Sequence, residues 1–399
     1  NRWNSEELFA VASQSETGRN LMAELSSEAR FLETLAGNEN QKLREGLLGN
    51  ASTPPEILKT IIRAFAADED DRVRHLAASN PRAPAKVLEA LAEEDESELV
   101  IHSVVVNPNM PLATLERLAQ EKFQLVFDAV ASDPRTPAIV LQSLMEDEWQ
   151  NIRAAVASNS NTPSATLEIL ARDEQEEVRC CSAGNPNTPV SALETLGREP
   201  NNTIREAVAT NPSTPSSTLA ALVEDPEESV RKGVASNPST SSSSLEKLGR
   251  DTSENVRRSV AGNPNTPIAL LEVLARDNAE DSRFPALGTV SSWVAGNPNT
   301  PVLTLMYFSA AQHHSVRNKL ACNPHTPGEV LRELSTDDNY SVRWNVARNA
   351  NAPLAVLEKL ARDGHNQVRL AVAENPTTSV KLLEALLHDD DEKIRLTVI

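Results

Sequence analysis

The sequence contains few aromatic residues, few cysteines and no long apolar run. Only 3% of its 399 residues are aromatic, whereas 39% are hydrophobic, so the core must consist mainly of leucine, valine and alanine. The three cysteines, Cys180, Cys181 and Cys322, form no paired framework that would indicate an oxidising compartment. We find no apolar stretch of the roughly 18 residues that a membrane span needs, and no signal peptide. These absences favour a cytoplasmic protein without a membrane segment.

Basic residues are also scarce relative to acidic ones. The chain has 38 lysines and arginines against 57 aspartates and glutamates, which gives a net charge of −19. A charge of this sign repels phosphate backbones and anionic lipid, and it keeps an extended protein soluble. We therefore expect a monomer that binds neither membranes nor, as a rule, nucleic acid.

What the sequence does contain is a repeat of about 26 residues. The repeat is marked by an asparagine that is usually followed by proline. Nine of the twelve intervals between the repeated positions are 26 residues, and the others are 30, 27 and 34. A fixed period of this length indicates a solenoid of stacked structural units. The thirteen anchor positions are Asn50, Asn80, Asn107, Asp133, Asn159, Asn185, Asn211, Asn237, Asn263, Asn297, Asn323, Asn349 and Asn375.

Each repeat predicts two short helices. In the unit that begins at Asn263, Thr266 is expected to cap a first helix and Pro267 to occupy its first position. Leucine lies eight residues after every anchor, and leucine again lies eleven after in eleven of thirteen repeats, which places both on one buried face. An acidic residue fourteen after the anchor, such as Asp225 before Pro226, is expected to start the second helix. That helix carries the pattern Val-Arg-x-x-Val-Ala and ends at the next anchor, where proline disfavours further helix.

The expected fold is therefore an all-α solenoid without β-sheet. Residues 1–23 do not follow the period and are interpreted as an N-terminal capping segment, whereas residues 24–399 form about fourteen tandem helical repeats, the last one truncated. Because the chain begins with Asn1 rather than methionine, and Ile399 precedes the next expected anchor, we expect a fragment of a larger protein. The long interval adds about eight residues after Asn278, and an insertion of this kind becomes a loop that either carries recognition or has no role.

The run Val-Arg-x-x-Val-Ala-x-Asn-Pro-x-Thr-Pro-x-x-x-Leu-x-x-Leu resembles the leucine-rich repeat variant family over about residues 24 to 399. The resemblance implies a right-handed superhelix of two-helix repeats, in which one helix is either α or 3₁₀. HEAT-like repeats are the most similar alternative. Members of the family can carry an N-terminal cysteine cluster that binds an iron–sulfur centre. No cysteine precedes Cys180 here, so we expect no such cofactor.

Two polar residues repeat often enough to form ladders along the stack. The arginine of the Val-Arg pair occupies eleven of fourteen equivalent positions. It forms either a spine that binds anions or nucleic acid, or a structural link to the acidic residue of its own or an adjacent repeat, and the one-for-one occurrence of the acid favours the link. The anchor asparagine is expected to bond backbone groups in the turn and in the next repeat. We assign to these ladders Arg153, Arg179, Arg205, Arg231, Arg257, Arg317, Arg343, Arg369, Asn185, Asn211, Asn237, Asn263 and Asn323.

No catalytic or metal-binding constellation is recognisable. Cys322 lies one residue before an anchor, where other repeats place small side chains, and His313 and His314 have no matching ligands nearby. Phosphate-binding glycine motifs are absent from the sequence. We therefore expect a protein without enzymatic activity, catalytic residues, metal or cofactor.

Positions where the repeat departs from its own pattern are the candidates for partner binding. Arginine is replaced by Ile101 and Phe127 in consecutive repeats, and apolar Trp344 and Leu370 follow the arginine in two later ones. An exposed apolar row would mark a partner site, whereas burial between repeats would give these residues a structural role only. The sequence thus favours a scaffold that binds a protein partner. The alternatives are nucleic-acid or anion binding along the arginine ladder, and a sensor or regulatory arm of a larger protein.

Overall fold

The computed structural model describes residues 62–63, 65–118, 124–277, 289–311 and 313–398. The expected capping segment, residues 1–23, and residues 24–61 lie outside this part of the chain. The described residues form helices and turns with no β-strand, as the sequence predicts. In that part, no helix is both long and apolar enough to cross a membrane.

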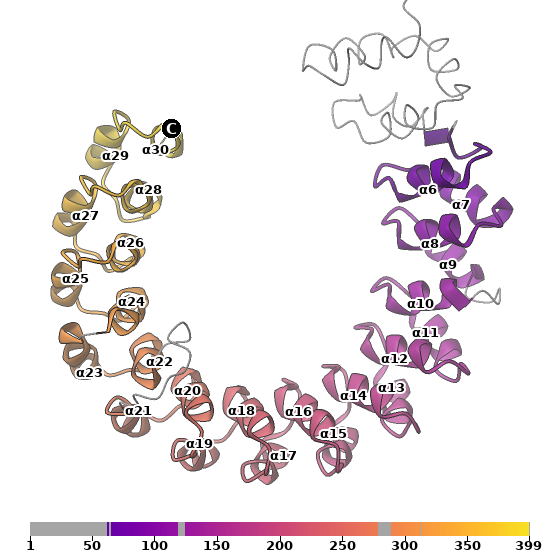
Figure 1. Ribbon diagram of the computed structural model, residues 1–399, viewed down its shortest axis with the longest axis horizontal. Helices are drawn as coiled ribbons and strands as arrows, with labels where there is room; N and C mark the ends of the chain where they lie inside the picture. The colour runs from indigo at the N-terminus through magenta and orange to yellow at the C-terminus, as the bar shows by residue number, and fades with distance from the viewer. Residues whose placement is uncertain (1–61, 64, 119–123, 278–288, 312, 399) are drawn as a thin grey trace, which may run out of the picture. The chain divides into compact units, whose positions relative to one another are not determined.

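The chain divides into two compact units, Asn1–Pro189 and Val190–Ile399. Within each unit, the helices alternate between two rows: first helices, which follow an anchor, and second helices, which precede the next anchor (Figure 1). In the first unit the second helices are α6 (Asp71–Ser79), α8 (Glu98–Val106), α10 (Gln124–Ser132), α12 (Gln150–Ser158) and α14 (Glu176–Gly184). The first helices are α7 (Ala85–Glu94), α9 (Leu112–Leu118), α11 (Ala138–Leu144) and α13 (Ser164–Leu170).

The second unit repeats the same alternation. Its first helices are α15 (Val190–Leu196), α17 (Ser216–Ala221), α19 (Ser242–Leu248), α21 (Ile268–Leu274), α23 (Val302–Tyr307), α25 (Gly328–Leu334), α27 (Leu354–Leu360) and α29 (Val380–Leu386). The second helices are α16 (Asn202–Thr210), α18 (Glu228–Ser236), α20 (Glu254–Gly262), α22 (Val290–Gly296), α24 (His314–Cys322), α26 (Tyr340–Arg348), α28 (Asn366–Glu374) and α30 (Glu392–Thr397). A short 3₁₀ segment, η2 (Phe308–Ala310), extends α23.

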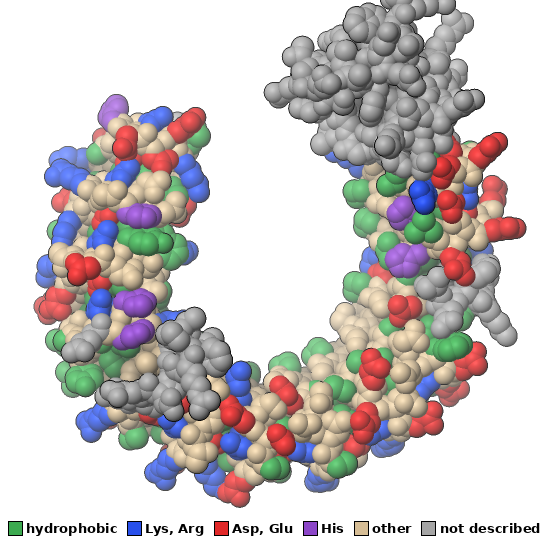
Figure 2. All heavy atoms as spheres, in the orientation of Figure 1, with side chains coloured by type: hydrophobic (Ala, Val, Ile, Leu, Met, Phe, Trp, Pro, Cys, Tyr) green, Lys and Arg blue, Asp and Glu red, His purple; other side chains and the backbone are tan. Residues whose placement is uncertain are grey.

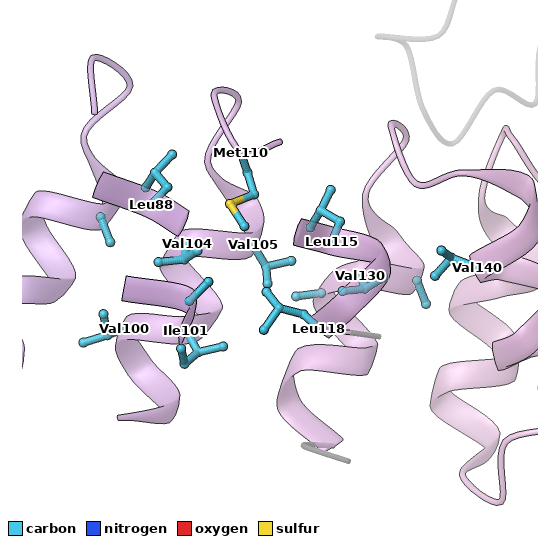
Figure 3. Close-up of a cluster of buried hydrophobic side chains, with 14 of the residues drawn as sticks. Leu88, Val100, Ile101, Val104, Val105, Met110, Leu115, Leu118, Val130 and Val140 are labelled. Carbon is cyan, nitrogen blue, oxygen red and sulfur yellow. The ribbon is translucent and has the colours of Figure 1, made fainter. Parts of the chain in front are cut away.

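Both helices of the repeat are α-helical, and neither would be stable alone at a length of six to ten residues. Stacking supplies the stability. In the unit from Asn263, Leu271 and Leu274 of the first helix are buried, and so are Val256 and Val260 of the preceding second helix. Figure 3 shows the corresponding core of the first unit, where apolar side chains from consecutive repeats meet.

The helix starts differ from the expected ones. Pro267 is the N-cap of α21 rather than its first residue, and Thr266 does not cap it. The Thr266 hydroxyl instead donates to the carbonyl of Val260, 2.5 Å away in the preceding second helix. The threonine therefore joins the two helices across the anchor turn, where it satisfies one of the carbonyls at the end of the second helix.

The acidic residue also has a different local role from the expected one. Helix α18 begins at Glu228, three residues after Asp225, and Glu227 is its N-cap. Asp225 Oδ1 accepts the backbone N–H of Glu227 at 3.0 Å, which forms an Asx turn before the helix. The aspartate thus shapes the connection between the two helices rather than capping the second one.

Candidate functional site

The anchor asparagines form a buried ladder within each unit. The Asn263 side-chain nitrogen donates to the carbonyls of Ala235 and Asn237, both at 2.9 Å, and its Oδ1 accepts the N–H of Asn265 at 2.8 Å. All three polar positions of the amide are used, so the residue is satisfied although only 2% exposed. The same pair of bonds to the preceding repeat is made by Asn107, Asn159, Asn185, Asn237, Asn297, Asn323, Asn349 and Asn375. Asn211 is equally buried, its Oδ1 accepts the N–H of Ser213, and its carbonyl receives the bond from Asn237.

Asp133 replaces asparagine in one anchor position, and Arg135 supplies one of the two missing donors, to the carbonyl of Val105. The guanidinium of Arg135 bonds both carboxylate oxygens of Asp133, with Nη2 2.5 Å from Oδ2. It also donates to the carbonyls of Pro108, at 2.6 Å, and Val105, at 3.4 Å, in the preceding repeat. An anchor asparagine and the Asp133–Arg135 pair thus both donate hydrogen bonds to backbone carbonyls of the preceding repeat.

The repeated arginines join each repeat to the next one. Arg231 donates from Nε and Nη2 to the two carboxylate oxygens of Asp251, at 2.6 and 3.2 Å, and from Nη1 to the Asp225 carbonyl of its own repeat. Because Asp251 belongs to the following repeat, the pair is a bidentate bond between neighbours. Equivalent pairs are Arg74–Asp95, Arg153–Asp173, Arg205–Asp225, Arg257–Asp277, Arg317–Asp337, Arg343–Asp363 and Arg369–Asp389. Arg179 makes the same Nη1 bond, to the Asp173 carbonyl.

This geometry gives no support to an anion-binding spine. Each of these paired arginine side chains is between 11% and 20% exposed, and its guanidinium is directed at a carboxylate. A phosphate would have to displace a bonded carboxylate from every position that it used. The described repeats instead contain the structural link between arginine and an acidic residue that the sequence favours.

The carboxylates of this ladder should make stability depend on acidic pH. Burial raises the pKa of Asp251, but the hydrogen bonds from Arg231 and from the Ser253 N–H outweigh burial, so the pKa lies below its usual value. A lowered pKa contributes stability above the unfolded-state value of about 4, and that stability is lost as the pH falls through the folded-state pKa. We expect the free energy of unfolding in urea to be nearly constant from about pH 7 to 5 and to fall below about pH 4.

Two variants separate the ladder from general charge effects. Asp251→Asn should be less stable than the unmodified chain near neutral pH and should lose less stability on acidification. Glu272→Gln changes an exposed acid on α21 and should leave the pH profile unaltered. Equal losses between pH 5 and 3 for the unmodified chain and Asp251→Asn would contradict the assignment.

The structure buries two of the four residues that the sequence suggested for partner binding. Ile101 and Leu370 are each only 6% exposed, and Ile101 lies within the core of Figure 3. Phe127 is half-buried and packs against the same core. An apolar side chain at these positions turns inward between helices, so Ile101 and Leu370 offer almost no surface to a partner and Phe127 only part of its ring. Trp344 is half-buried, with the guanidinium of Arg348 4.6 Å from its ring centroid.

The exposed apolar row that was expected to mark a partner site is therefore incomplete. Two other surfaces of the second unit depart from the repeat pattern. The first is an apolar patch on α23 and α21, which we call the α23 patch. Leu303 and Tyr307 are 80% and 66% exposed, Val302 and Met306 are 50% and 44% exposed, and Val273 of α21 is 64% exposed. Eight of the other first helices place glutamate where α23 has Met306, at the ninth residue after the anchor. The α23 patch differs from these helices because its exposed position 306 carries an apolar methionine instead of a charged glutamate.

The second surface is a strip of cationic and aromatic side chains on second helices, which we call the basic–aromatic strip. It consists of Lys232, Arg258, Trp293, Lys319, Trp344 and Arg348, on α18, α20, α22, α24 and α26. Figure 2 shows histidine and hydrophobic side chains over the neighbouring second helices α24, α26 and α28. A sequence signal for both surfaces exists, since no acidic residue occurs between Asp281 and Glu329 although the chain has 57. Residues 278–288, which contain most of the insertion after Asn278, lie outside the described part.

The cysteines and histidines do not assemble a reactive site in the described residues. No group of three or more histidine, cysteine, aspartate or glutamate side chains that could hold a metal ion occurs there. Partial desolvation raises the pKa of the surface-exposed Cys322 thiol more than the nearby Lys319 and Arg348 lower it. His313 and His314 stack on each other at the start of α24.

These features define a tandem α-helical repeat protein whose recurring polar side chains connect neighbouring repeats. A family model described as leucine rich repeat variant matches residues 151–175, 203–227 and 367–391. The resemblance inferred from the sequence is confirmed at these three places.

Solved structures of helical repeat proteins are also similar. A leucine-rich repeat variant with a novel repetitive structural motif is 23% identical, and the alignment covers 57% of this chain and 88% of that one, with a TM-score of 0.42. Yeast importin-β (Kap95p) is 11% identical over 98% of this chain and 60% of its own, with a TM-score of 0.35. Kap121p bound to Pho4p is 10% identical over 96% of this chain and 49% of its own, with a TM-score of 0.27. The chain thus spans about half to three-fifths of the length of these two proteins. A comparison with curated proteins found no match.

Proposed function

We propose that this chain is a non-enzymatic repeat scaffold that binds a protein partner through its exposed repeat surface. The observation that carries the proposal is the α23 patch, where Val302, Leu303, Met306 and Tyr307 are all at least 44% exposed on one short helix. A contiguous apolar surface costs solubility in a free protein, and it is typical of a site that a partner covers. The repeated polar side chains support the non-enzymatic part of the proposal, because hydrogen bonds between repeats already occupy them.

Affinity capture from the native cell, followed by mass spectrometry, tests this proposal. The bait is the intact chain, and the variant is Leu303→Asp/Tyr307→Asp, which places two charges in the α23 patch. Because central apolar contacts dominate binding energies, we expect recovery of the specific partner to fall by at least about tenfold. The matched control is Ser191→Asp/Thr195→Asp, which makes the same change at the equivalent exposed positions of α15.

Circular dichroism of both variants should show an unchanged melting temperature, since all four positions are exposed. A partner recovered equally with all three baits would show that the α23 patch is not its binding site. Failure to capture any specific partner with the unmodified chain would count against the scaffold function itself.

A further inference from the structure

The basic–aromatic strip is continuous from α18 to α26. Lys232, Arg258 and Trp293 line one surface cavity of about 300 Å³, together with Gly262 and Pro264. Trp293 packs so closely on Gly262 that a Cβ on this glycine would lie 2.9 Å from the indole ring. Because residue 262 has no side chain, the indole can lie directly against α20. There it forms one wall of the cavity.

The strip continues beyond Trp293 through a second set of contacts. The Lys319 ammonium lies 4.8 Å from the centroid of a Trp293 ring, a cation–π contact between neighbouring repeats. Arg348 lies over the Trp344 ring within α26, with its guanidinium 4.6 Å from the ring centroid. Each tryptophan is thus held in place by a cation, and each cation keeps an outer side that faces solvent.

The charges along the strip are mostly uncompensated. Arg258 is bonded by Glu254, at 2.7 Å, but Lys232, Lys319 and Arg348 form no ion pair with any described residue. Helices α22, α24 and α26 contain no acidic residue at all. The part of the strip on α22, α24 and α26 therefore lacks acidic neighbours on its own helices within a chain of net charge −19, which makes this part attractive to anions.

Side-chain amides between the two tryptophans add polar recognition. Asn345 donates from Nδ2 to Asn318 Oδ1 of the preceding repeat. Asn345 is buried, but the half-buried Asn318 keeps amide hydrogens that can donate to the C=O of a peptide unit. Three unpaired cations are few against a net charge of −19, which favours a peptide over a nucleic-acid strand.

We propose that the basic–aromatic strip binds an extended, acidic peptide segment of a partner protein, with an apolar side chain of that segment in the cavity beside Trp293. Acidic side chains of the segment would pair with Lys232, Lys319 and Arg348. Five helices at roughly 9 Å spacing span roughly 36 Å, which corresponds to about 11 extended residues. This inference rests on the protein-binding function proposed above but uses a different surface from the α23 patch.

The test is selection of a random 12-residue peptide library on the intact chain, followed by fluorescence anisotropy of the enriched peptides. We expect enrichment of aspartate and glutamate together with an aromatic or aliphatic residue. Lys319→Glu/Arg348→Glu should weaken binding of these peptides by about tenfold or more, because two attractive contacts become repulsive. The control, Lys247→Glu/Lys381→Glu, makes the same charge change on the first helices α19 and α29 and should have little effect.

Three outcomes would overturn the inference. Enriched peptides without an acidic bias would do so, as would acidic peptides whose affinity the Lys319→Glu/Arg348→Glu variant leaves unchanged. Tighter binding of a 12-residue thymidine oligonucleotide than of any peptide, lost in the same variant, would assign the strip to nucleic acid instead. The proposed scaffold function would survive these results if the α23 patch variant still lost its partner.

Discussion

Asn263→Asp is expected to lower the free energy of unfolding by about 4 kcal/mol, although it changes only one NH₂ group to oxygen. Asn263 is 2% exposed, and its Nδ2 donates to the carbonyls of Ala235 and Asn237. An aspartate there would bring a carboxylate against two carbonyl oxygens without any hydrogen between them. The site must then either hold an unpaired buried charge or bind a proton that satisfies only one acceptor. Urea unfolding monitored by circular dichroism measures the loss.

The chain contains a natural arrangement on which a rescue experiment can be based. Asp133 already occupies an anchor position, and Arg135, two residues later, pairs with it and donates to the preceding repeat. Adding Asn265→Arg to Asn263→Asp should reproduce this arrangement and restore roughly half of the lost stability, a coupling that a double-mutant cycle quantifies. Asn265→Arg alone should change stability by less than about 0.5 kcal/mol, because position 265 is exposed. Additive effects of the two substitutions would mean that Arg135 does not replace the asparagine donors.

Leu271→Ala is expected to cost about 3 kcal/mol through the cavity that it leaves. Leu271 is 0% exposed and lies in the middle of the second unit, where the layers above and below it cannot collapse without moving whole helices. Leu303→Ala is the control on the neighbouring first helix, and because Leu303 is 80% exposed it should cost less than about 0.5 kcal/mol. Chemical denaturation of both variants gives the comparison.

Hydrogen exchange should show which repeats Leu271→Ala destabilises. Contacts in a solenoid run only between neighbouring repeats, so a local defect weakens nearby repeats most. Amides of α19 to α23 should therefore exchange faster in Leu271→Ala, and those of α27 to α29 should change little. Uniform acceleration across the second unit would indicate that its repeats unfold as one cooperative body.

The sequence predicts the helix pairs and their buried faces because these depend on spacing alone. Leucines eight and eleven residues after an anchor share a face of any helix, wherever that helix packs. The pairing of arginine with acid was predictable for a related reason: two residues that repeat one for one, twenty positions apart, keep the same geometry in every copy.

The helix starts were less predictable because they depend on where a turn directs its side chains. Thr266 could either cap the helix after it or donate to the helix before it, and the choice follows from the position of the Val260 carbonyl in the folded turn. The exposed apolar residues of α23 were missed for a similar reason. A hydrophobic residue that departs from a pattern can face inward, like Leu370, or outward, like Leu303, and only the packing distinguishes the two. The stretch without acidic residues between Asp281 and Glu329 was the better sequence signal, because it contains the exposed apolar helix α23.

The asparagine ladder also determines how the array can change in length. Asn297 lies 34 residues after Asn263, not 26, yet its side chain meets the carbonyls of Ala261 and Asn263 at 2.7 and 2.9 Å, as in the regular repeats. Eight additional residues between two repeats therefore leave these two asparagine hydrogen bonds unchanged. Whole repeats can likewise be duplicated or deleted, because every anchor requires only the carbonyls of the repeat before it. Such an array can evolve, or be engineered, in length and in loop content separately from the side chains on its exposed surfaces.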